Sequence, residues 1–136
     1  DHLEKTIRPA LARGEVVITD RFADSTRVFQ GLTRGDLSAI VDRLHDLMIG
    51  MEPDLTLLFD LDPAIGLARA TARAGAELRF EDMGLDFQTK ARAGFLALAK
   101  AHARFRVIDA DADPDTVAAR VRSTLAERLG TSLSTA

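Results

Sequence analysis

Three short, mainly apolar runs, each followed closely by acidic residues, constrain the fold of this chain more than any other feature. The runs lie at 16–18, 55–59 and 106–108, and the polar residues that follow them are Asp20-Arg21, Asp60-Leu61-Asp62 and Asp109-Ala110-Asp111. Val16-Val17-Ile18 is β-branched throughout and does not alternate with polar residues, which is typical of a strand buried on both faces of a parallel sheet. The runs therefore predict parallel strands with polar C-terminal ends, where open α/β sheets bind their ligands.

Segments with helical periodicity surround these runs. Leu3, Ile7 and Leu11 predict a helix over 1–12, in which Pro9 is expected to cause a kink. Further helices are predicted at 23–30, 37–48, 63–73, 85–102 and 114–129, with loops at 31–35 and 74–76. Asp36, Asp62 and Asp113 are the expected N-caps. This alternation of strands and helices predicts an α/β fold with a doubly wound parallel sheet.

Composition narrows the possible classes of protein. The 136 residues are 46% hydrophobic and 29% charged, as in a globular domain, and we expect one domain over 1–130 with a flexible tail over 131–136. The net charge of -3 gives no general reason to expect a nucleic-acid partner. The absence of cysteine excludes disulfides and thiolate metal sites. Without a long apolar run or a signal peptide, we expect a cytoplasmic protein that does not bind membranes.

The pair Asp20-Arg21 is the first candidate for chemistry. An arginine can hold a phosphate through two parallel hydrogen bonds, and a neighbouring aspartate can orient a hydroxyl group or a magnesium-bound water. For the pair alone, the competing interpretation is a surface ion pair at the end of a strand.

Two other clusters also have structural interpretations. Arg69 and Arg73 share a helix face, which is typical either of an anion site or of a solvated surface. The acidic run 109–115 lacks the central glycine and late glutamate of a calcium loop, and Asp113 is better explained as a helix cap. The three histidines show no ligand spacing.

The wider sequence around Asp20 is more specific. The stretch Asp20-Arg21-Phe22-x-x-Ser25-Thr26-x-x-Phe29-Gln30-Gly31-x-x-Arg34-Gly35 resembles the signature of bacterial thymidylate kinases. Further segments similar to that family are Thr6–Gly14, Pro53–Pro63, Gly66–Arg69, Arg79–Glu81 and Val107–Ala110. The resemblance covers roughly residues 2 to 129, in order and with natural spacing.

This resemblance implies a fold and a reaction. The implied fold is the doubly wound parallel sheet of P-loop nucleoside monophosphate kinases. The implied reaction transfers the γ-phosphoryl group of ATP to dTMP, with Mg²⁺ accompanying ATP, and gives dTDP and ADP. ATP and dTMP are the implied partners. The family is usually homodimeric, and helix 1–12 is a candidate for part of the twofold face.

The resemblance also assigns roles to residues. Asp20, Arg21 and Arg73 are the implied catalytic residues, with Arg21 on the phosphate of dTMP and Asp20 near the phosphoryl acceptor. The nucleoside side of that pocket is implied to be lined by Ser25, Thr26, Phe29 and Gln30. Relatives often carry Tyr where this chain has Phe29, and core packing is the alternative role for that ring.

On the ATP side, the resemblance implies a lid over about 69–82. Its implied residues are Arg69, Arg73 and Arg79, with Asp109 beside the adenine. No residue of the chain is assigned as a metal ligand.

One part that such a kinase needs is missing from the sequence. None of Lys5, Lys90 and Lys100 follows a glycine, so the chain holds no G-x-x-x-x-G-K-[ST] phosphate loop. In the family, this loop follows a first strand that precedes residue 1 in the sequence. In the sheet, that first strand lies between the strands predicted at 16–18 and 55–59. We therefore expect the fold to be incomplete, and the 136 residues alone to be poorly folded or self-associated and inactive. The alternatives to a thymidylate kinase function are a related nucleoside or nucleotide kinase with another acceptor and a non-catalytic truncated fragment.

Overall fold

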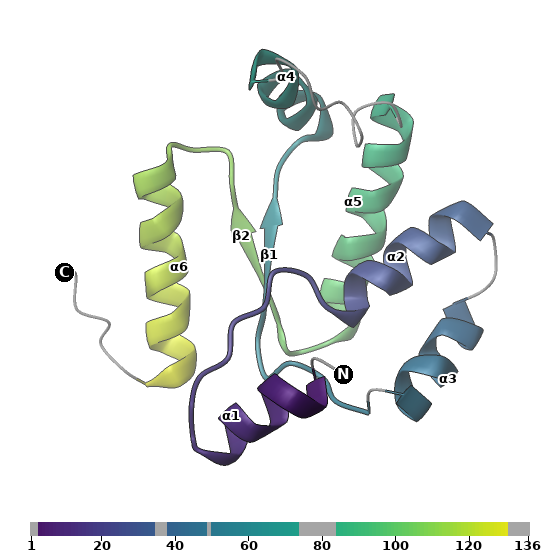
Figure 1. Ribbon diagram of the computed structural model, residues 1–136. Coiled ribbons are helices and arrows are strands. Elements are labelled where there is room, and N and C mark those ends of the chain that lie inside the picture. Colours follow the sequence, from purple (N-terminus) through teal and green to yellow (C-terminus); the bar gives the residue numbers. More distant parts are fainter. Residues whose placement is uncertain (1–2, 35–37, 49, 74–83, 131–136) are drawn as a thin grey trace. The chain divides into compact units, whose positions relative to one another are not determined.

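The computed structural model describes residues 3–34, 38–48, 50–73 and 84–130 (Figure 1). The chain divides into two compact units, Asp1–Glu52 and Pro53–Ala136. The first unit is helical, and the second contains the strands. The extent predicted for the domain, 1–130, stays a prediction.

The first unit begins with a helical segment that changes from a π-helix to an α-helix. A π-helical turn, η1 (Leu3–Ile7), leads directly into α1 (Arg8–Ala12). Pro9 is the second residue of α1 and follows η1 without a break, so its missing N–H falls where the hydrogen-bond pattern changes from π-helical to α-helical. The predicted helix is confirmed over Leu3–Ala12, whereas the kink expected at Pro9 stays a prediction. Ile7 and Ala10 are buried, whereas Leu11 is partly exposed.

The predicted strand at 16–18 is wrong for this structure. The segment has no regular secondary structure and belongs to no sheet, and the exposed fractions of Val16 and Ile18 are 81% and 90%. A strand is stable only when a neighbouring strand satisfies its backbone N–H and C=O groups. The described residues contain one sheet, in which β1 (Thr56–Asp60) pairs with β2 (Phe105–Asp109) alone. The apolar run therefore has no ladder partner here.

Two helices complete the first unit. Helix α2 (Ala23–Arg34) begins where it was predicted but runs through Gly31, which was expected in a loop. A glycine inside a helix costs only about 0.5–1 kcal/mol relative to alanine, so its neighbours can carry the helix past it. Helix α3 (Ser38–Met48) contacts α2. The predicted cap Asp36 lies outside the described residues.

The second unit contains the predicted α/β arrangement. Strands β1 and β2 are parallel, with Thr56 opposite Phe105 and Asp60 opposite Asp109. They are joined through α4 (Pro63–Arg73) and α5 (Gly84–Ala101), and α6 (Pro114–Leu129) follows β2. Helix α5 contacts both strands and α6 contacts β2, and Figure 1 shows these helices flanking the pair. The α/β class with parallel strands is confirmed.

The core of the second unit is small. Among the described residues of this unit, the buried apolar ones are Ala91, Phe105 and Ile108, whereas Phe59 and Val107 on the strands are about half exposed. Arg104 donates a hydrogen bond from Nη1 to Thr56 Oγ1 at 2.8 Å and lies over the Phe105 ring, which ties the two strands at their first residues.

Local capping explains where the helices of this unit begin and end. Asp62 Oδ1 accepts from the Ala64 N–H at 2.8 Å, and Asp113 Oδ1 accepts from the Thr116 N–H at 3.0 Å. Gly130 ends α6 in the left-handed conformation, with φ at 63°. The caps predicted at Asp62 and Asp113 are thus confirmed. Among the described residues, none of the helices has the length and apolarity needed to cross a lipid bilayer.

Candidate functional site

The segment before α2 holds Asp20 and Arg21 in an exposed position. Arg21 has φ at 62°, in the left-handed region that residues with a Cβ rarely adopt. The next turn closes through a hydrogen bond from the Ser25 N–H to the Phe22 carbonyl at 3.1 Å. Strained backbone of this kind costs about 1–3 kcal/mol and often occurs at binding sites. The motif therefore contains a conformation that its sequence does not favour.

Arg21 lies close to an aromatic ring of α2. Its guanidinium carbon is 5.6 Å from the centroid of the Phe29 ring, within the range of a cation–π contact. Phe29 shares one face of α2 with Ser25, Thr26 and Gln30, and we call these residues the candidate face of α2. Thr26 and Gln30 are exposed, and Ser25 and Phe29 are half-buried. The structure thus brings Arg21 beside one of the predicted nucleoside-lining residues.

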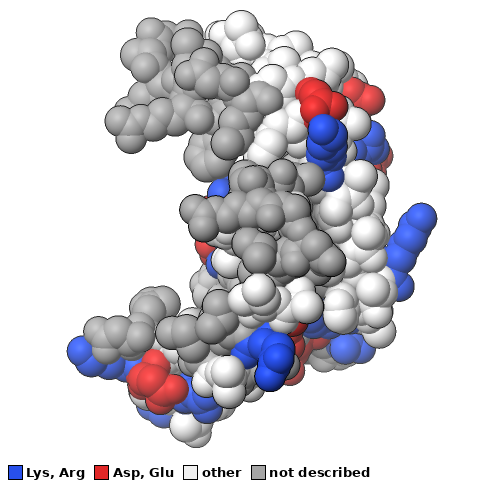
Figure 2. Space-filling model, turned by 90° about the vertical axis from the view of Figure 1, so that its right-hand side faces the viewer, with Lys and Arg blue, Asp and Glu red and all other residues white. Residues whose placement is uncertain are grey.

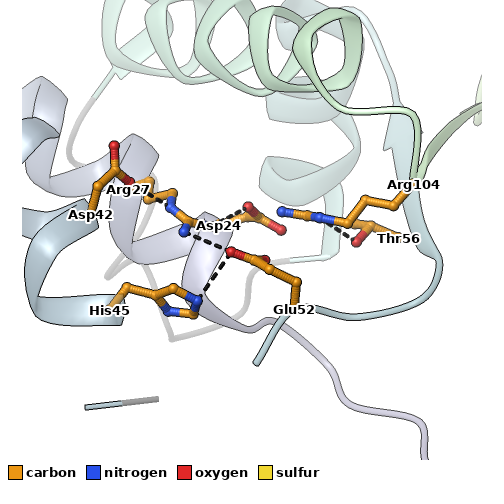
Figure 3. A network of polar contacts seen from close by, with 7 residues as sticks. All are labelled: Asp24, Arg27, Asp42, His45, Glu52, Thr56 and Arg104. Atoms are coloured by element: carbon orange, nitrogen blue, oxygen red, sulfur yellow. Dashed lines mark hydrogen bonds and ion pairs between the residues drawn. The ribbon is translucent and has the colours of Figure 1, made fainter. Parts of the chain in front are cut away.

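The opposite face of α2 carries a charged cluster, the Arg27 network, made of Asp24, Arg27, Asp42, His45 and Glu52 (Figure 3). Arg27 donates from Nε to Asp42 Oδ1 at 2.8 Å, from Nη1 to Asp24 Oδ1 at 3.0 Å, and from Nη2 to Glu52 Oε1 at 2.7 Å. The hydrogen bond to Glu52, supported by those to Asp42 and Asp24, raises the pKa of Arg27 against the opposing effect of burial. One guanidinium therefore joins α2, α3 and the segment after α3.

His45 extends this network from α3. Its Nε2 lies 3.0 Å from Glu52 Oε1, and its side chain is only 4% exposed. Neither ring nitrogen makes a well-aligned hydrogen bond to the described residues, so the short distance is a close contact that becomes an ion pair only when the ring is protonated.

Sequence reasoning missed the Arg27 network. Asp24 and Arg27 are three positions apart on a face that also carries the buried Val28, and two charged residues on such a face indicate buried pairing. That signal was available in the sequence. The partners Asp42 and Glu52 give no comparable signal, because tertiary structure alone brings them to Arg27.

In the second unit, the polar ends of two strands meet as predicted. Asp60 and Asp109 are register partners at the last positions of β1 and β2, and the Ala110 N–H donates to the Asp60 carbonyl at 2.9 Å. Arg92 of α5 holds the Asp60 carboxylate through Nε and Nη2, at 2.7 and 2.9 Å. This hydrogen-bonded pair lowers the pKa of Asp60, against the opposing effect of burial.

Two further arginines reach the loop that follows β2. Arg69 of α4 donates to the Ala110 carbonyl at 3.3 Å and to Asp111 Oδ1 at 3.0 Å. Arg120 of α6 donates to the Asp109 carbonyl at 2.6 Å and lies 3.0 Å from Asp109 Oδ2. Two of the predicted ATP-side residues, Arg69 and Asp109, are thus brought to the same loop. We call Arg69, Asp109, Ala110 and Asp111 the strand-end cluster.

The other predicted ATP-side residues are less well defined. Arg73 is the last residue of α4, and its side chain is not among those described. Arg79 and the rest of the predicted lid from residue 74 onward lie outside the described residues, as does the predicted tail over 131–136. Their assigned roles stay predictions.

The charges available for binding anions are dispersed. On the face drawn in Figure 2, the basic and acidic side chains of the described residues are intermingled rather than gathered by sign. Within the ranges that the structure describes, no group of three or more His, Asp or Glu side chains is placed to hold a metal ion by itself.

Comparison with known proteins agrees with this arrangement. The family model described as thymidylate kinase matches residues 1–121. The thymidylate kinase of Ruegeria pomeroyi is 65% identical over 122 residues, which are 89% of this chain and 58% of that protein. The thymidylate kinase of Jannaschia sp. is 57% identical over 130 residues, covering 95% of this chain and 62% of that protein.

A solved structure gives the same result. The crystal structure of thymidylate kinase from Ehrlichia chaffeensis matches with a TM-score of 0.68 and 33% sequence identity, over 91% of this chain and 58% of that one. The chain therefore spans about three fifths of the length of these relatives. Because the family model covers most of the chain and the predicted fold is found, this chain belongs to the thymidylate kinase family.

Proposed function

We propose that the protein containing this chain transfers the γ-phosphoryl group of ATP to dTMP, giving dTDP and ADP. The observation that carries this proposal is the exposed Arg21, set in a strained left-handed backbone beside Phe29 at the start of the candidate face. A strained and exposed arginine with an adjacent ring has the chemistry to take a phosphate attached to a nucleoside. The family membership supplies the reaction.

The first unit would hold the acceptor. Arg21 would grip the phosphate of dTMP through its planar fork of N–H donors. Ser25, Thr26, Phe29 and Gln30 would line the nucleoside, with the Phe29 ring providing an apolar wall and no hydroxyl group. Asp20, one residue before Arg21, would lie near the phosphoryl acceptor and near the metal that accompanies ATP.

The second unit would contribute to the donor side. Arg69 and Asp109 of the strand-end cluster would flank the adenine, at the polar ends of β1 and β2 where parallel sheets place their ligands. Arg73 and Arg79 would act from the lid, with Arg73 as the arginine that neutralises charge developing on the transferred phosphoryl group.

Mg²⁺ fits this scheme as a companion of ATP rather than as a resident ion. It is usually bound through one or two carboxylates plus substrate phosphates, and the exposed Asp20 can supply one such carboxylate. Bound in this way, Mg²⁺ would neutralise negative charge on the phosphates of ATP. A cytoplasmic location and a homodimeric assembly are parts of the same proposal.

The direct test is a phosphoryl-transfer assay with ATP, Mg²⁺ and a panel of acceptors. The complete protein should turn over dTMP in preference to dUMP and dCMP, and the 136 residues alone should be inactive because they hold no G-x-x-x-x-G-K-[ST] loop. Preferential turnover of another acceptor would point to a related nucleotide kinase. A lack of turnover with every acceptor by the complete protein would contradict the proposal.

A further inference from the structure

Helix α2 has two faces of different character. The candidate face is exposed or half-buried, whereas Asp24 and Val28 on the opposite face are only 5% and 6% exposed. Successive helical residues are rotated by about 100°, so these two sets of side chains point in opposite directions. Whatever holds the buried face therefore also fixes where the candidate face points.

The Arg27 network holds that buried face. Arg27 lies on α2, and its guanidinium reaches Asp42 on α3 and Glu52 after α3, with distances of 2.8 and 2.7 Å. Figure 3 shows the dashed contacts of Asp24, Asp42 and Glu52 converging on this one side chain. The Arg27 side chain is 14% exposed and that of Asp24 is 7% exposed, so these charges are largely removed from water. Charges in such surroundings depend strongly on their partners.

The geometry also limits which residue can occupy this position. Three nitrogen atoms of one planar group each donate to a carboxylate from a different segment. A lysine ammonium is a point charge on a flexible stem, and it cannot reproduce three divergent directions at once. The network therefore fixes the rotation of α2 about its axis as well as its distance from α3.

We propose that Arg27 is a positioning residue for the acceptor site. It does not lie on the candidate face, and it acts by holding α2 so that Ser25, Thr26, Phe29 and Gln30 are presented together beside Arg21. This inference rests on the proposed function, since it takes the candidate face to be the acceptor site. Small misplacements of substrate-binding groups are enough to cost much of the reaction rate.

The test uses the complete protein and the mildest changes to the network. Glu52→Gln keeps the shape of the side chain but removes the charge that faces Arg27 and His45. Arg27→Lys keeps a positive charge but loses the fork. Arg13→Gln is the matched control, because Arg13 makes an exposed pair with Glu15 in the same unit and belongs to neither α2 nor the Arg27 network.

The expected result is a change in the kinetics of the acceptor, dTMP, without a matching change in those of ATP. The KM for dTMP should rise about threefold to tenfold in Glu52→Gln and more in Arg27→Lys, while the KM for ATP stays within about twofold. Amide hydrogen exchange over 23–34 should become faster in both variants. Arg13→Gln should leave these quantities unchanged.

Two results would overturn the inference, and they can be distinguished. If wild-type protein turns over dTMP and Glu52→Gln lowers the melting temperature without changing the KM for dTMP, Arg27 has only a structural role. If wild-type protein does not use dTMP at all, the proposed function fails, and this inference fails with it.

Discussion

Arg92 makes a bidentate pair of hydrogen bonds with the Asp60 carboxylate, from Nε to Oδ1 at 2.7 Å and from Nη2 to Oδ2 at 2.9 Å. Paired hydrogen bonds of this kind fix orientation as well as distance. Asp60 ends β1 and Arg92 lies within α5, so the pair attaches a helix to the polar end of the sheet. The pair therefore fixes the end of β1, whose Asp60 carbonyl accepts a hydrogen bond from Ala110 of the strand-end cluster.

The pair predicts how acid affects the second unit. Arg92 lowers the pKa of Asp60 in the folded state, so this contribution to stability is fully present above the unfolded pKa of about 3.9. It is lost as the pH falls through the lower, folded pKa. Asp60→Asn should therefore reduce stability at pH 7 and flatten the loss of stability below about pH 5.

Urea unfolding of the complete protein, followed by far-UV circular dichroism at several pH values, measures this effect. Asp86→Asn is the control, since Asp86 pairs with Lys90 on the surface and is 82% exposed. An acid profile of Asp60→Asn parallel to that of the wild type would show that the pair does not contribute.

The strained backbone at Arg21 predicts opposite effects on stability and on substrate use. Arg21→Gly removes the Cβ that makes φ of 62° unfavourable and should stabilise the protein by about 1 kcal/mol. Arg21→Ala keeps the Cβ and should not. Both variants lack the guanidinium and should lower kcat/KM for dTMP by about 100-fold. Unchanged dTMP kinetics in either variant would remove Arg21 from the site.

The parts of the fold that depend on local signals were predictable. Helix α6 begins after Asp113, which caps its N-terminus, and ends at Gly130, which adopts the left-handed conformation. Both signals depend only on residue type at the helix end. The same holds for Asp62 and α4. The polar ends of β1 and β2 could be predicted to meet because parallel strands in one sheet end on the same side.

The parts that depend on distant partners were not predictable. The run at 16–18 has the composition of a strand, but pairing decides whether it becomes one, and no partner strand lies in the described residues. The Arg27 network is likewise assembled from charges on separate segments. The left-handed φ of Arg21 is strain imposed by its surroundings, which residue preference does not indicate.

The cap of α6 predicts a difference between two substitutions. Asp113 accepts hydrogen bonds from the Thr116 N–H and from Thr116 Oγ1, and the bond from the Thr116 side chain is the main cause that lowers the pKa of Asp113. Asp113→Asn keeps a cap and should change the melting temperature little, whereas Asp113→Ala should lower it clearly.

The carboxylate at this cap also has a pH signature. Because its folded pKa is depressed, its contribution is present above the unfolded pKa and is lost as the pH falls through the folded value. The gap in melting temperature between wild type and Asp113→Ala should therefore narrow toward pH 3. A gap that stays constant with pH would show that the carboxylate charge is not what stabilises α6.

The strand-end cluster predicts a change confined to the donor nucleotide. Arg69 reaches the loop after β2 through the Ala110 carbonyl and Asp111, and under the proposed function it flanks the adenine. Arg69→Ala should raise the KM for ATP about threefold to tenfold and leave the KM for dTMP within about twofold.

Arg120→Ala is the matched control, because Arg120 holds Asp109 in the same loop from α6 but has no assigned contact with ATP. If both variants raise the KM for ATP equally, the effect comes from loosening the loop, and Arg69 has no direct role. A larger effect of Arg69→Ala, with similar melting temperatures for the two variants, would place the guanidinium of Arg69 at the nucleotide.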